Sequence, residues 1–144
     1  MNSQEIQRKI EQVCGDIFVG VYAKNRLPEL SRTPALLIAN TDDDDKSGTH
    51  WVALYIARNG EYFDTFAKRP HQTFINYMNK YCVNWIASPR QVQSSISRFC
   101  GHHCVMYCIF KSRGMTLRQI YSIYTLDFGL NDVVAHDIVC RRLL

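Results

Sequence analysis

Six cysteines and five histidines are the residues of this chain best suited to covalent or metal chemistry. One cysteine stands out, because Cys100 comes directly before Gly101 at the expected start of an apolar helix. A thiol at a helix N-terminus lies at the positive end of the helix dipole, which lowers its pKa from about 8.5. Gly101 would let a substrate or another stretch of backbone approach closely. The position indicates a thiol nucleophile, although a cysteine here could also serve only packing.

The same segment offers four candidate metal ligands in five residues, since His102 and His103 lie between Cys100 and Cys104. Structural zinc sites, however, usually join two separated ligand pairs. The sequence has no second cluster of that kind. Cys100, Cys104 and Cys108 also share one helix face at four-residue spacing, where small thiols usually pack. We therefore expect no metal site.

A thiol nucleophile needs a base, usually a histidine, and the histidine needs an acceptor that fixes its tautomer. His50 fits best, because it lies where a Gly-Thr loop enters an apolar strand. His102 and His103 follow the nucleophile on its own helix, and their side chains should point away from it or past it. His71 and His136 have the sequence context of surface residues. We therefore expect His50 to be the base.

Asp64 lies in the apolar run that follows the next turn, where an unpaired carboxylate would be costly to bury. It needs a partner, and His50 is available on the neighbouring strand. Closing the hairpin on Arg58–Gly60 would put Asp64 opposite Leu54, roughly 13 Å from His50. A loop tightened to Ala57–Asn59, a bulge or strong strand twist would bring the pair onto the diagonal where cross-strand side chains interact. The sequence leaves this register open.

An oxyanion formed during acyl transfer needs hydrogen-bond donors. The backbone N–H of the nucleophile is one, and a side-chain amide shortly before it is a usual second. Gln93 precedes Cys100 by seven residues, with a serine-rich turn between them. Gln91 is the weaker candidate. We therefore expect Gln93 to complete the oxyanion hole.

The elements that must position these groups form an α+β pattern in a single domain over residues 1–144. The dipeptide Asn59-Gly60 predicts a hairpin. The acidic run Asp42–Asp45 predicts a solvated loop. Strands are expected over 34–40, 50–56 and 61–66, with short extended pieces at 85–88 and 91–94. Helices are expected over 3–14 (capped by Ser3), 71–82, 100–111, 116–125 and 131–143 (started by Asn131 and Asp132).

Composition excludes several classes of protein. With 144 residues, 47% hydrophobic and 21% charged, the chain is neither disordered nor fibrous. No run approaches the roughly 18 apolar residues of a membrane span, and the first residues lack the apolar core of a signal peptide. We therefore expect no membrane association and an intracellular, reducing compartment that keeps the cysteines as thiols. The net charge of +4 permits weak DNA binding without requiring it.

Taken together, these residues resemble a known family. Gly48-Thr-His50-Trp51, Tyr62-Phe-Asp64, Gln93 and Cys100-Gly101 occur in the order typical of adenovirus-type (adenain-like) cysteine proteases. The chain resembles most the proteases of Maverick/Polinton DNA transposons and related DNA viruses. The same order is similar to that of the SUMO- and ubiquitin-like-protein proteases. The resemblance covers about residues 15–110, including a segment at 21–28.

The resemblance implies His50 as general base, Asp64 orienting it, Gln93 in the oxyanion hole and Cys100 as nucleophile, with Trp51 walling the site. It implies a small mixed β-sheet flanked by helices, with the nucleophile at the N-terminus of a central helix. The implied reaction is peptide-bond hydrolysis through a thioester, commonly after small residues such as Gly. The implied substrates are virion or capsid precursor proteins, and the protein would act in the host nucleus or cytoplasm, or inside virions.

The chain departs from the family in two ways. It is shorter than the adenovirus enzymes, and Phe99 stands where a small or acidic residue usually precedes the nucleophile. In the adenovirus protease, an upstream cysteine forms a disulfide with an activating peptide, and DNA also activates. Cys82, eighteen residues before Cys100, lies in a comparable stretch. A disulfide-linked activating peptide and DNA are thus further implications, beside the simpler interpretation that Cys82 packs at a helix end.

Three functions remain open at this point. An endopeptidase that requires no cofactor and works as a monomer is favoured. A deconjugating protease for a ubiquitin-like protein would keep the same site and change the substrate. A non-catalytic, DNA-associated virion protein is the alternative that uses none of this chemistry.

Overall fold

The computed structural model describes residues 1–45 and 50–141. The chain begins with α1 (Ser3–Glu11), η1 (Gly15–Ile17), β1 (Phe18–Ala23), η2 (Lys24–Arg26) and β2 (Ala35–Asn40). It continues through β3 (Trp51–Ile56), β4 (Asn59–Phe63), α2 (Gln72–Tyr81) and β5 (Asn84–Ala87). Three helices follow, α3 (Cys100–Ser112), α4 (Leu117–Tyr121) and α5 (Phe128–Arg141). No helix in the described part of the chain is both long enough and apolar enough to span a membrane.

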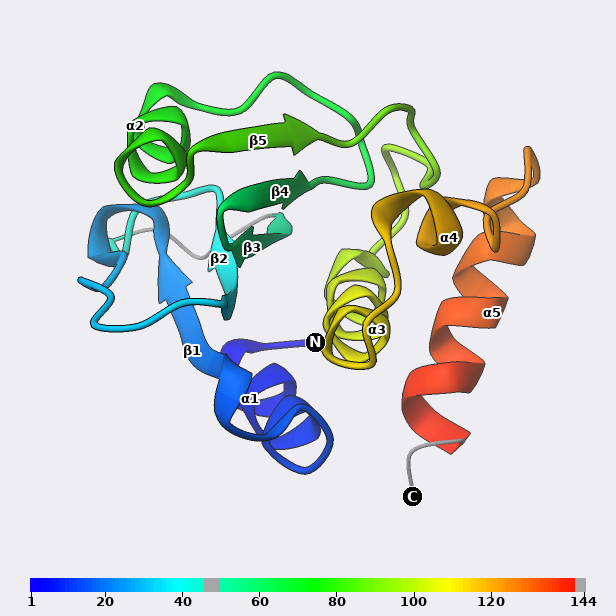
Figure 1. The fold of residues 1–144 in the computed structure, drawn as a ribbon. Coiled ribbons are helices and arrows are strands. Elements are labelled where there is room, and N and C mark those ends of the chain that lie inside the picture. The colour runs from blue at the N-terminus through cyan, green and yellow to red at the C-terminus, as the bar shows by residue number, and fades with distance from the viewer. Residues whose placement is uncertain (46–49, 142–144) are drawn as a thin grey trace.

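The strands form one five-stranded sheet in the order β1-β2-β3-β4-β5. The two outer pairs, β1–β2 and β4–β5, are parallel, and the two inner pairs are antiparallel. Helices cover both faces of this mixed sheet, and α5 lies beyond α3 on the side away from the strands (Figure 1). The predicted fold class, a small mixed sheet flanked by helices, is therefore confirmed.

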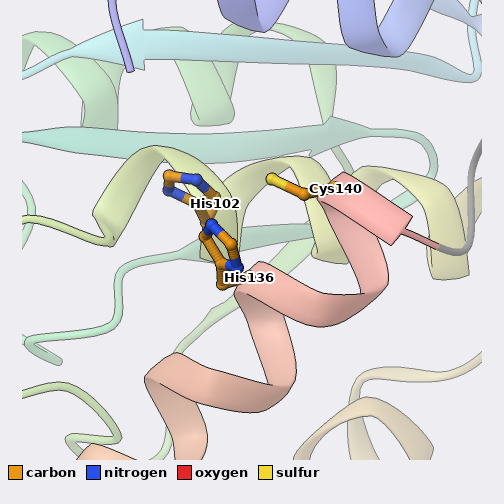
Figure 2. A group of neighbouring side chains, drawn as sticks. All are labelled: His102, His136 and Cys140. Carbon is orange, nitrogen blue, oxygen red and sulfur yellow. The ribbon is translucent and has the colours of Figure 1, made fainter.

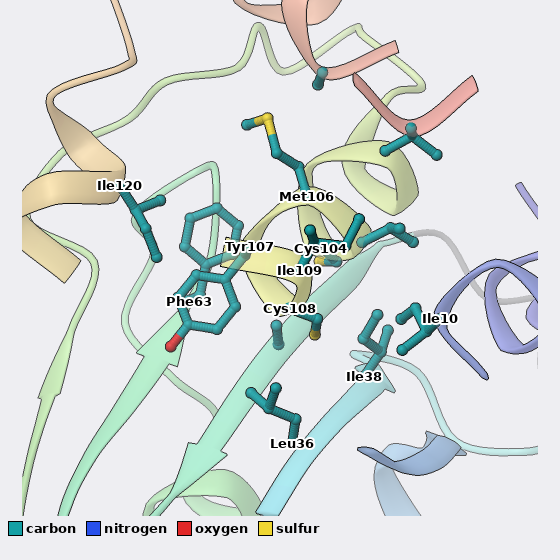
Figure 3. Packing of buried hydrophobic residues seen from close by; sticks show 14 of the residues in the cluster. Ile10, Leu36, Ile38, Phe63, Cys104, Met106, Tyr107, Cys108, Ile109 and Ile120 are labelled. Carbon is teal, nitrogen blue, oxygen red and sulfur yellow. The ribbon is translucent and has the colours of Figure 1, made fainter. Parts of the chain in front are cut away.

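The alternation of side chains along the strands divides the core in two. Alternate residues such as Leu36 and Ile38 on β2 face α1, α3 and α5, and pack in one buried cluster. The residues between them, such as Leu37, face α2 in a second cluster. Figure 3 shows the larger cluster, in which the rings of Phe63 and Tyr107 stack with centroids 4.5 Å apart. The helix α3 is thus the central helix that the sequence predicted.

The β3–β4 hairpin closes more tightly than its Asn59-Gly60 dipeptide suggests. Tyr55 pairs with Glu61, and the pairing continues through Ala53 and Phe63. This register closes the loop on Ala57–Asn59, one of the alternatives left open by the sequence. One further step along the strands places Asp64 opposite Val52, on the diagonal from His50.

Two helix starts differ from the sequence prediction. Helix α1 is capped by Asn2 and not by Ser3, because Asn2 and Glu5 form a reciprocal capping box, and the helix ends at Glu11. Helix α5 begins at Phe128, where the Asp127 carboxylate accepts a hydrogen bond (3.0 Å) from the backbone N–H of Leu130.

Inside α5, Asn131 and Asp132 bond to other parts of the chain instead of capping the helix. The Asn131 amide donates to the carbonyl of Val92 (2.9 Å).

The predicted extended piece at 91–94 forms no strand, and the backbone N–H of Val92 donates one hydrogen bond to the carbonyl of Thr65 (2.9 Å). Helix α4 spans only residues 117–121 of the predicted 116–125.

Candidate active site

His50 lies immediately before the first residue of β3 and is buried. Its backbone carbonyl accepts a hydrogen bond (3.0 Å) from the N–H of Thr41, which extends the pairing between β2 and β3. The end of a central strand therefore fixes the position of this histidine. The preceding Gly48 and Thr49, part of the predicted motif, fall outside the described residues.

The carboxylate of Asp64 lies beside the His50 ring. His50 Nε2 and Asp64 Oδ1 are 2.6 Å apart, and both side chains are almost fully buried. Two backbone N–H groups also donate to this carboxylate, from Phe66 (2.9 Å) and from Lys68 (3.3 Å). The backbone N–H of Asp64 donates to Ser88 Oγ (2.8 Å). The turn after β4 thus supplies donors that satisfy a buried carboxylate, which sequence reasoning expected to pair with His50.

Phe66 covers one face of the histidine. Its ring lies parallel to the His50 ring, with the centroids 4.1 Å apart and an interplanar angle of 12°. This contact shields the His50–Asp64 hydrogen bond from water, which strengthens it. The sequence analysis did not identify Phe66 as a site residue. The signal that could have found it is its position two residues after Asp64.

Cys100 is the first residue of α3, as predicted, and its side chain is buried at the end of the helix. Burial by itself raises the pKa of the Cys100 thiol. The His50 side chain and the backbone N–H groups of Trp51 and Gly101 outweigh that effect, so the pKa is below its ordinary value.

His50 shows the reciprocal shift. Burial by itself lowers the pKa of His50, but hydrogen bonding with Asp64 and Cys100, and their negative charge, raise it to about 9. Among the described residues, His50 Nδ1 is buried and has no hydrogen bond of ordinary geometry. The interaction between His50 and Cys100 is thus looser than an ideal hydrogen bond, as in many active sites without substrate.

Gly101 is where the N-terminal segment and β3 approach the nucleophile helix. A methyl group at this position would lie 3.2 Å from Met1 Cβ and 3.5 Å from Trp51 Cδ1. The Trp51 indole N–H donates to the backbone carbonyl of Met1 (3.3 Å). Gly101 therefore admits side chains beside Cys100, where the sequence suggested approach of a substrate or backbone.

Gln93 is fully buried and fixed at both ends of its amide. Its carbonyl oxygen accepts a hydrogen bond from the hydroxyl of Thr65, and its amide nitrogen donates to Ser97 Oγ (3.0 Å) and to the Ser97 carbonyl (3.2 Å). Gln91 is exposed and donates to the backbone carbonyl of Gln93 (2.8 Å). Gln93 thus lies in a network that orders the turn before Cys100, and its role as an oxyanion donor remains a prediction.

That network extends to α5 and involves a histidine that the sequence placed correctly away from the nucleophile. Ser97 Oγ donates to Asp132 (2.7 Å), and the other oxygen of Asp132 lies 2.8 Å from His103 Nε2. His103 Nδ1 lies 2.9 Å from the hydroxyl of Tyr124. Both ring nitrogens of His103 are therefore occupied by structural partners.

All six cysteines are free thiols in the structure. Burial raises the pKa of four of them, Cys14, Cys82, Cys104 and Cys108. Cys82 follows the last residue of α2 and packs in the core against the α2 side of the sheet. This position fits the packing interpretation, and the predicted disulfide to an activating peptide stays untested.

A surface pocket opens directly on the His50–Asp64 pair. It is lined by aromatic, basic and hydroxyl-bearing side chains and by the His50–Asp64 pair. The residues that line it are Thr41, His50, Tyr62, Asp64, Phe66, Lys68, Arg69, His71, Phe74, Ser95 and Ser97. His71, one of these, also caps α2 through a hydrogen bond (3.1 Å) from the backbone N–H of Thr73. The pocket thus connects His50 to solvent, whereas Cys100 is not among its lining residues.

Comparison with known proteins identifies the fold and not a sequence family. No family model matches the chain, and no curated protein sequence matches it. Two crystal structures of the ASFV pS273R protease superimpose with TM-scores of 0.56 and 0.54, at 16% and 20% sequence identity. They cover 83% and 72% of this chain, which spans only 59% and 44% of theirs.

Two further structures cover the whole chain. The SUMO protease Ulp1, with its catalytic cysteine oxidised to a sulfinic acid, gives a TM-score of 0.51 at 13% identity, over 79% of its own length. The central domain of the Lpg1148 protein from Legionella pneumophila gives 0.56 at 10% identity, over 98% of its length. The chain therefore has the fold shared by the ASFV and SUMO cysteine proteases, in agreement with the resemblance drawn from its motifs.

Proposed function

We propose that this protein is a cysteine endopeptidase in which Cys100, His50 and Asp64 form the catalytic triad. One observation carries the proposal: the buried His50–Asp64 pair leaves a single histidine nitrogen unpartnered, and the thiol at the start of α3 interacts with that histidine. The fold, shared with cysteine proteases, supports the same conclusion.

The first half of the reaction forms a thioester. With the Cys100 proton held on His50, the sulfur attacks the carbonyl carbon of the scissile peptide bond, and a tetrahedral oxyanion forms. The C–N bond then breaks, and His50 gives its proton to the leaving amine. Asp64 keeps the imidazole oriented and stabilises its charged form throughout.

The second half regenerates the enzyme. His50 takes a proton from a water molecule, whose oxygen attacks the thioester carbon. The C–S bond then breaks, and the acid product leaves while the proton returns to the Cys100–His50 pair.

The oxyanion would be held by the backbone N–H of Cys100 and by the Gln93 amide. A residue at the first position of a helix has no intrahelical acceptor for its N–H, so this donor is available. The two Ser97 acceptors of Gln93 belong to one residue, so one amide hydrogen can be shared between them. The second amide hydrogen then remains for the substrate.

We propose a polypeptide substrate that is cleaved after a small residue such as Gly. The natural substrates would be virion or capsid precursor proteins. The support is the motif resemblance together with the likeness to a viral protease. The monomeric state and the intracellular location, which rests on the six cysteines expected as thiols, belong to the same proposal. Activation by DNA or by a peptide linked to Cys82 also belongs to it and rests on the resemblance alone.

A ubiquitin-like protein is the second candidate substrate. The likeness to the SUMO protease Ulp1 extends over the whole of this chain and favours it. The site chemistry would be the same, so only substrate selection separates the two functions.

The test is cleavage of a peptide library containing Gly at the cleaved position, beside a panel of ubiquitin-like precursors. We expect cleavage by the wild-type chain, loss of it in Cys100→Ala, and its retention in Cys104→Ala. Cys104 is a matched control because it is a buried cysteine one turn further along α3. Cleavage that survives Cys100→Ala, or a folded chain that cleaves nothing and binds DNA with a steep salt dependence, would contradict the proposal.

A further inference from the structure

A second group of reactive side chains lies where the first turns of α3 pack against α5 (Figure 2). His102 on α3 meets His136 and Cys140 on α5, and one ligand atom from each lies within 4.8 Å of the other two. Figure 2 shows the two imidazoles and the thiol gathered where the two helices pack. His136 and Cys140 are four residues apart on α5, so they share one helix face.

The His102 side chain has a polar atom that the fold leaves unsatisfied. Its Nδ1 is buried and has no hydrogen-bond partner among the described residues. The rings of His102 and His136 lie 5.3 Å apart between centroids, yet no hydrogen bond joins them. A buried nitrogen without a partner is uncommon, and a bound ion is one of the few ways to satisfy it.

Aromatic packing explains only part of this arrangement. Phe99 contacts both histidine rings, at 5.0 Å from His102 and 5.9 Å from His136 between centroids. These contacts account for the ring positions. They account neither for the buried nitrogen nor for the thiol of Cys140 at its side.

We propose that His102, His136 and Cys140 bind a zinc ion that ties the start of α3 to the last turns of α5. Two imidazoles and a thiolate are ligands that Zn²⁺ prefers, whereas Ca²⁺ and Mg²⁺ require oxygen atoms. Zinc bonds of about 2.0–2.3 Å in a tetrahedron separate ligand atoms by roughly 3.5 Å. The observed spacing thus needs a closure of only about 1 Å, which small side-chain rotations supply.

Access from solvent also fits. His136 is exposed and lies in the wall of a surface pocket together with Phe99 and Asp132, so an ion can enter from solvent. Binding removes the proton of the Cys140 thiol to the buffer as the Zn–S bond forms, with no change of oxidation state. Three protein ligands leave the fourth position for a water molecule.

This site is independent of the proposed proteolysis and differs from the local cluster considered in the sequence. Of the four candidates between Cys100 and Cys104, only His102 takes part. Cys104 is fully buried elsewhere in the core, and His103 is bound to Asp132. The other two ligands come from α5, more than thirty residues further along the chain.

The test uses Cys100→Ser protein, because the thiol beside His50 could itself bind a metal. Cobalt(II), the spectroscopic substitute for zinc, is titrated while its visible bands and the sulfur-to-cobalt charge-transfer band are recorded. We expect one equivalent to bind with tetrahedral bands, and zinc to displace it. Zinc should also raise the thermal unfolding midpoint of this protein.

Variants in the same background assign the ligands. Cys140→Ser should abolish the charge-transfer band, and His136→Ala should weaken binding by more than about tenfold, the lower limit for losing even an indirect ligand contact. Cys82→Ser and His71→Asn, a matched cysteine and a matched surface histidine, should change neither. Because His136 is exposed, its replacement leaves the core intact. Failure of the parent protein to bind cobalt, or binding that is unchanged in Cys140→Ser or His136→Ala, would overturn the proposal.

Discussion

The 2.6 Å contact between His50 Nε2 and Asp64 Oδ1 determines which ring nitrogen faces the nucleophile. With Nε2 donating to the carboxylate, a neutral His50 carries no proton on Nδ1, which can then accept one from Cys100. The only unpartnered atom of the ring is therefore the one the chemistry requires. Asp64 sets this tautomer, and Phe66 stacks on the face of the same ring.

Removing the Asp64 charge should slow cleavage and shift its pH dependence. In the wild type, activity should rise as Cys100 ionises, below the ordinary thiol pKa, and fall above pH 9 as His50 loses its proton. Asp64→Asn removes the carboxylate that raises the pKa of His50, so the alkaline limb should move to lower pH. We expect a loss of about 10²–10⁴-fold in kcat/KM, measured as a pH–rate profile. An alkaline limb that stays in place would contradict the role given to Asp64.

Gln93 offers a test that separates oxyanion stabilisation from thiol activation. Gln93→Glu keeps the shape and the acceptor for Thr65 but loses the amide hydrogens. We expect kcat to fall by about 10²–10³-fold, a larger loss than that in the alkylation rate of Cys100, which reports only the lost bonds to Ser97. Gln91→Ala, on an exposed neighbour, serves as the control and should behave like the wild type. Equal losses in alkylation and cleavage would mean that Gln93 only orders the turn before Cys100.

A buried ion pair connects β4 to α3 and makes a prediction about stability. Glu61 accepts hydrogen bonds from the hydroxyl of Tyr107 (2.6 Å) and from Lys111 Nζ (3.0 Å). Glu61→Ala would leave a mostly buried ammonium and a buried hydroxyl without this acceptor. We expect it to cost about 3–5 kcal/mol in urea unfolding, and the double change Glu61→Met with Lys111→Met to cost much less. Similar losses of unfolding free energy in both proteins would show that the unpaired charge is not the cause of the destabilisation.

Two glycines form a matched pair for testing the packing of the hairpin. A methyl group on Gly60 would lie 2.5 Å from the sulfur of Cys82 and 2.9 Å from the backbone oxygen of Tyr55, so the strand must shift. Gly60→Ala should therefore lower the free energy of unfolding by about 1–3 kcal/mol. Gly129→Ala, where the nearest atom lies 3.4 Å away, should be neutral or slightly stabilising. A stability for Gly60→Ala equal to that of Gly129→Ala would contradict the close packing.

Local patterns in the sequence were enough to predict most of the elements and the nucleophile position, but they missed β1. Short apolar runs identified β2, β3 and β4, and an apolar stretch beginning at Cys100 identified α3. Helix starts were less certain, because Asn2 and Ser3 are both good capping residues and only the reciprocal bond to Glu5 decides between them.

Distances across the fold could not be read from the sequence. The separation of His50 from Asp64 depends on a hairpin register that differs by one residue on each strand between alternatives. The partners of Gln93, and the meeting of His102 with His136 and Cys140, depend on how separate turns and helices pack. Such contacts arise from tertiary packing and have no local signal.

The pairing of Cys100 with His50 is tested most directly by alkylation of Cys100 with iodoacetamide as a function of pH, measured by peptide mass spectrometry in wild type and His50→Ala. In the wild type, Cys100 should react at a pH well below the ordinary thiol pKa of about 8.5, and it should react faster than the buried Cys104. In His50→Ala the low-pH reactivity should disappear, because the group that lowers the pKa is gone. Identical pH profiles in the two proteins, or faster labelling of Cys104, would contradict the account.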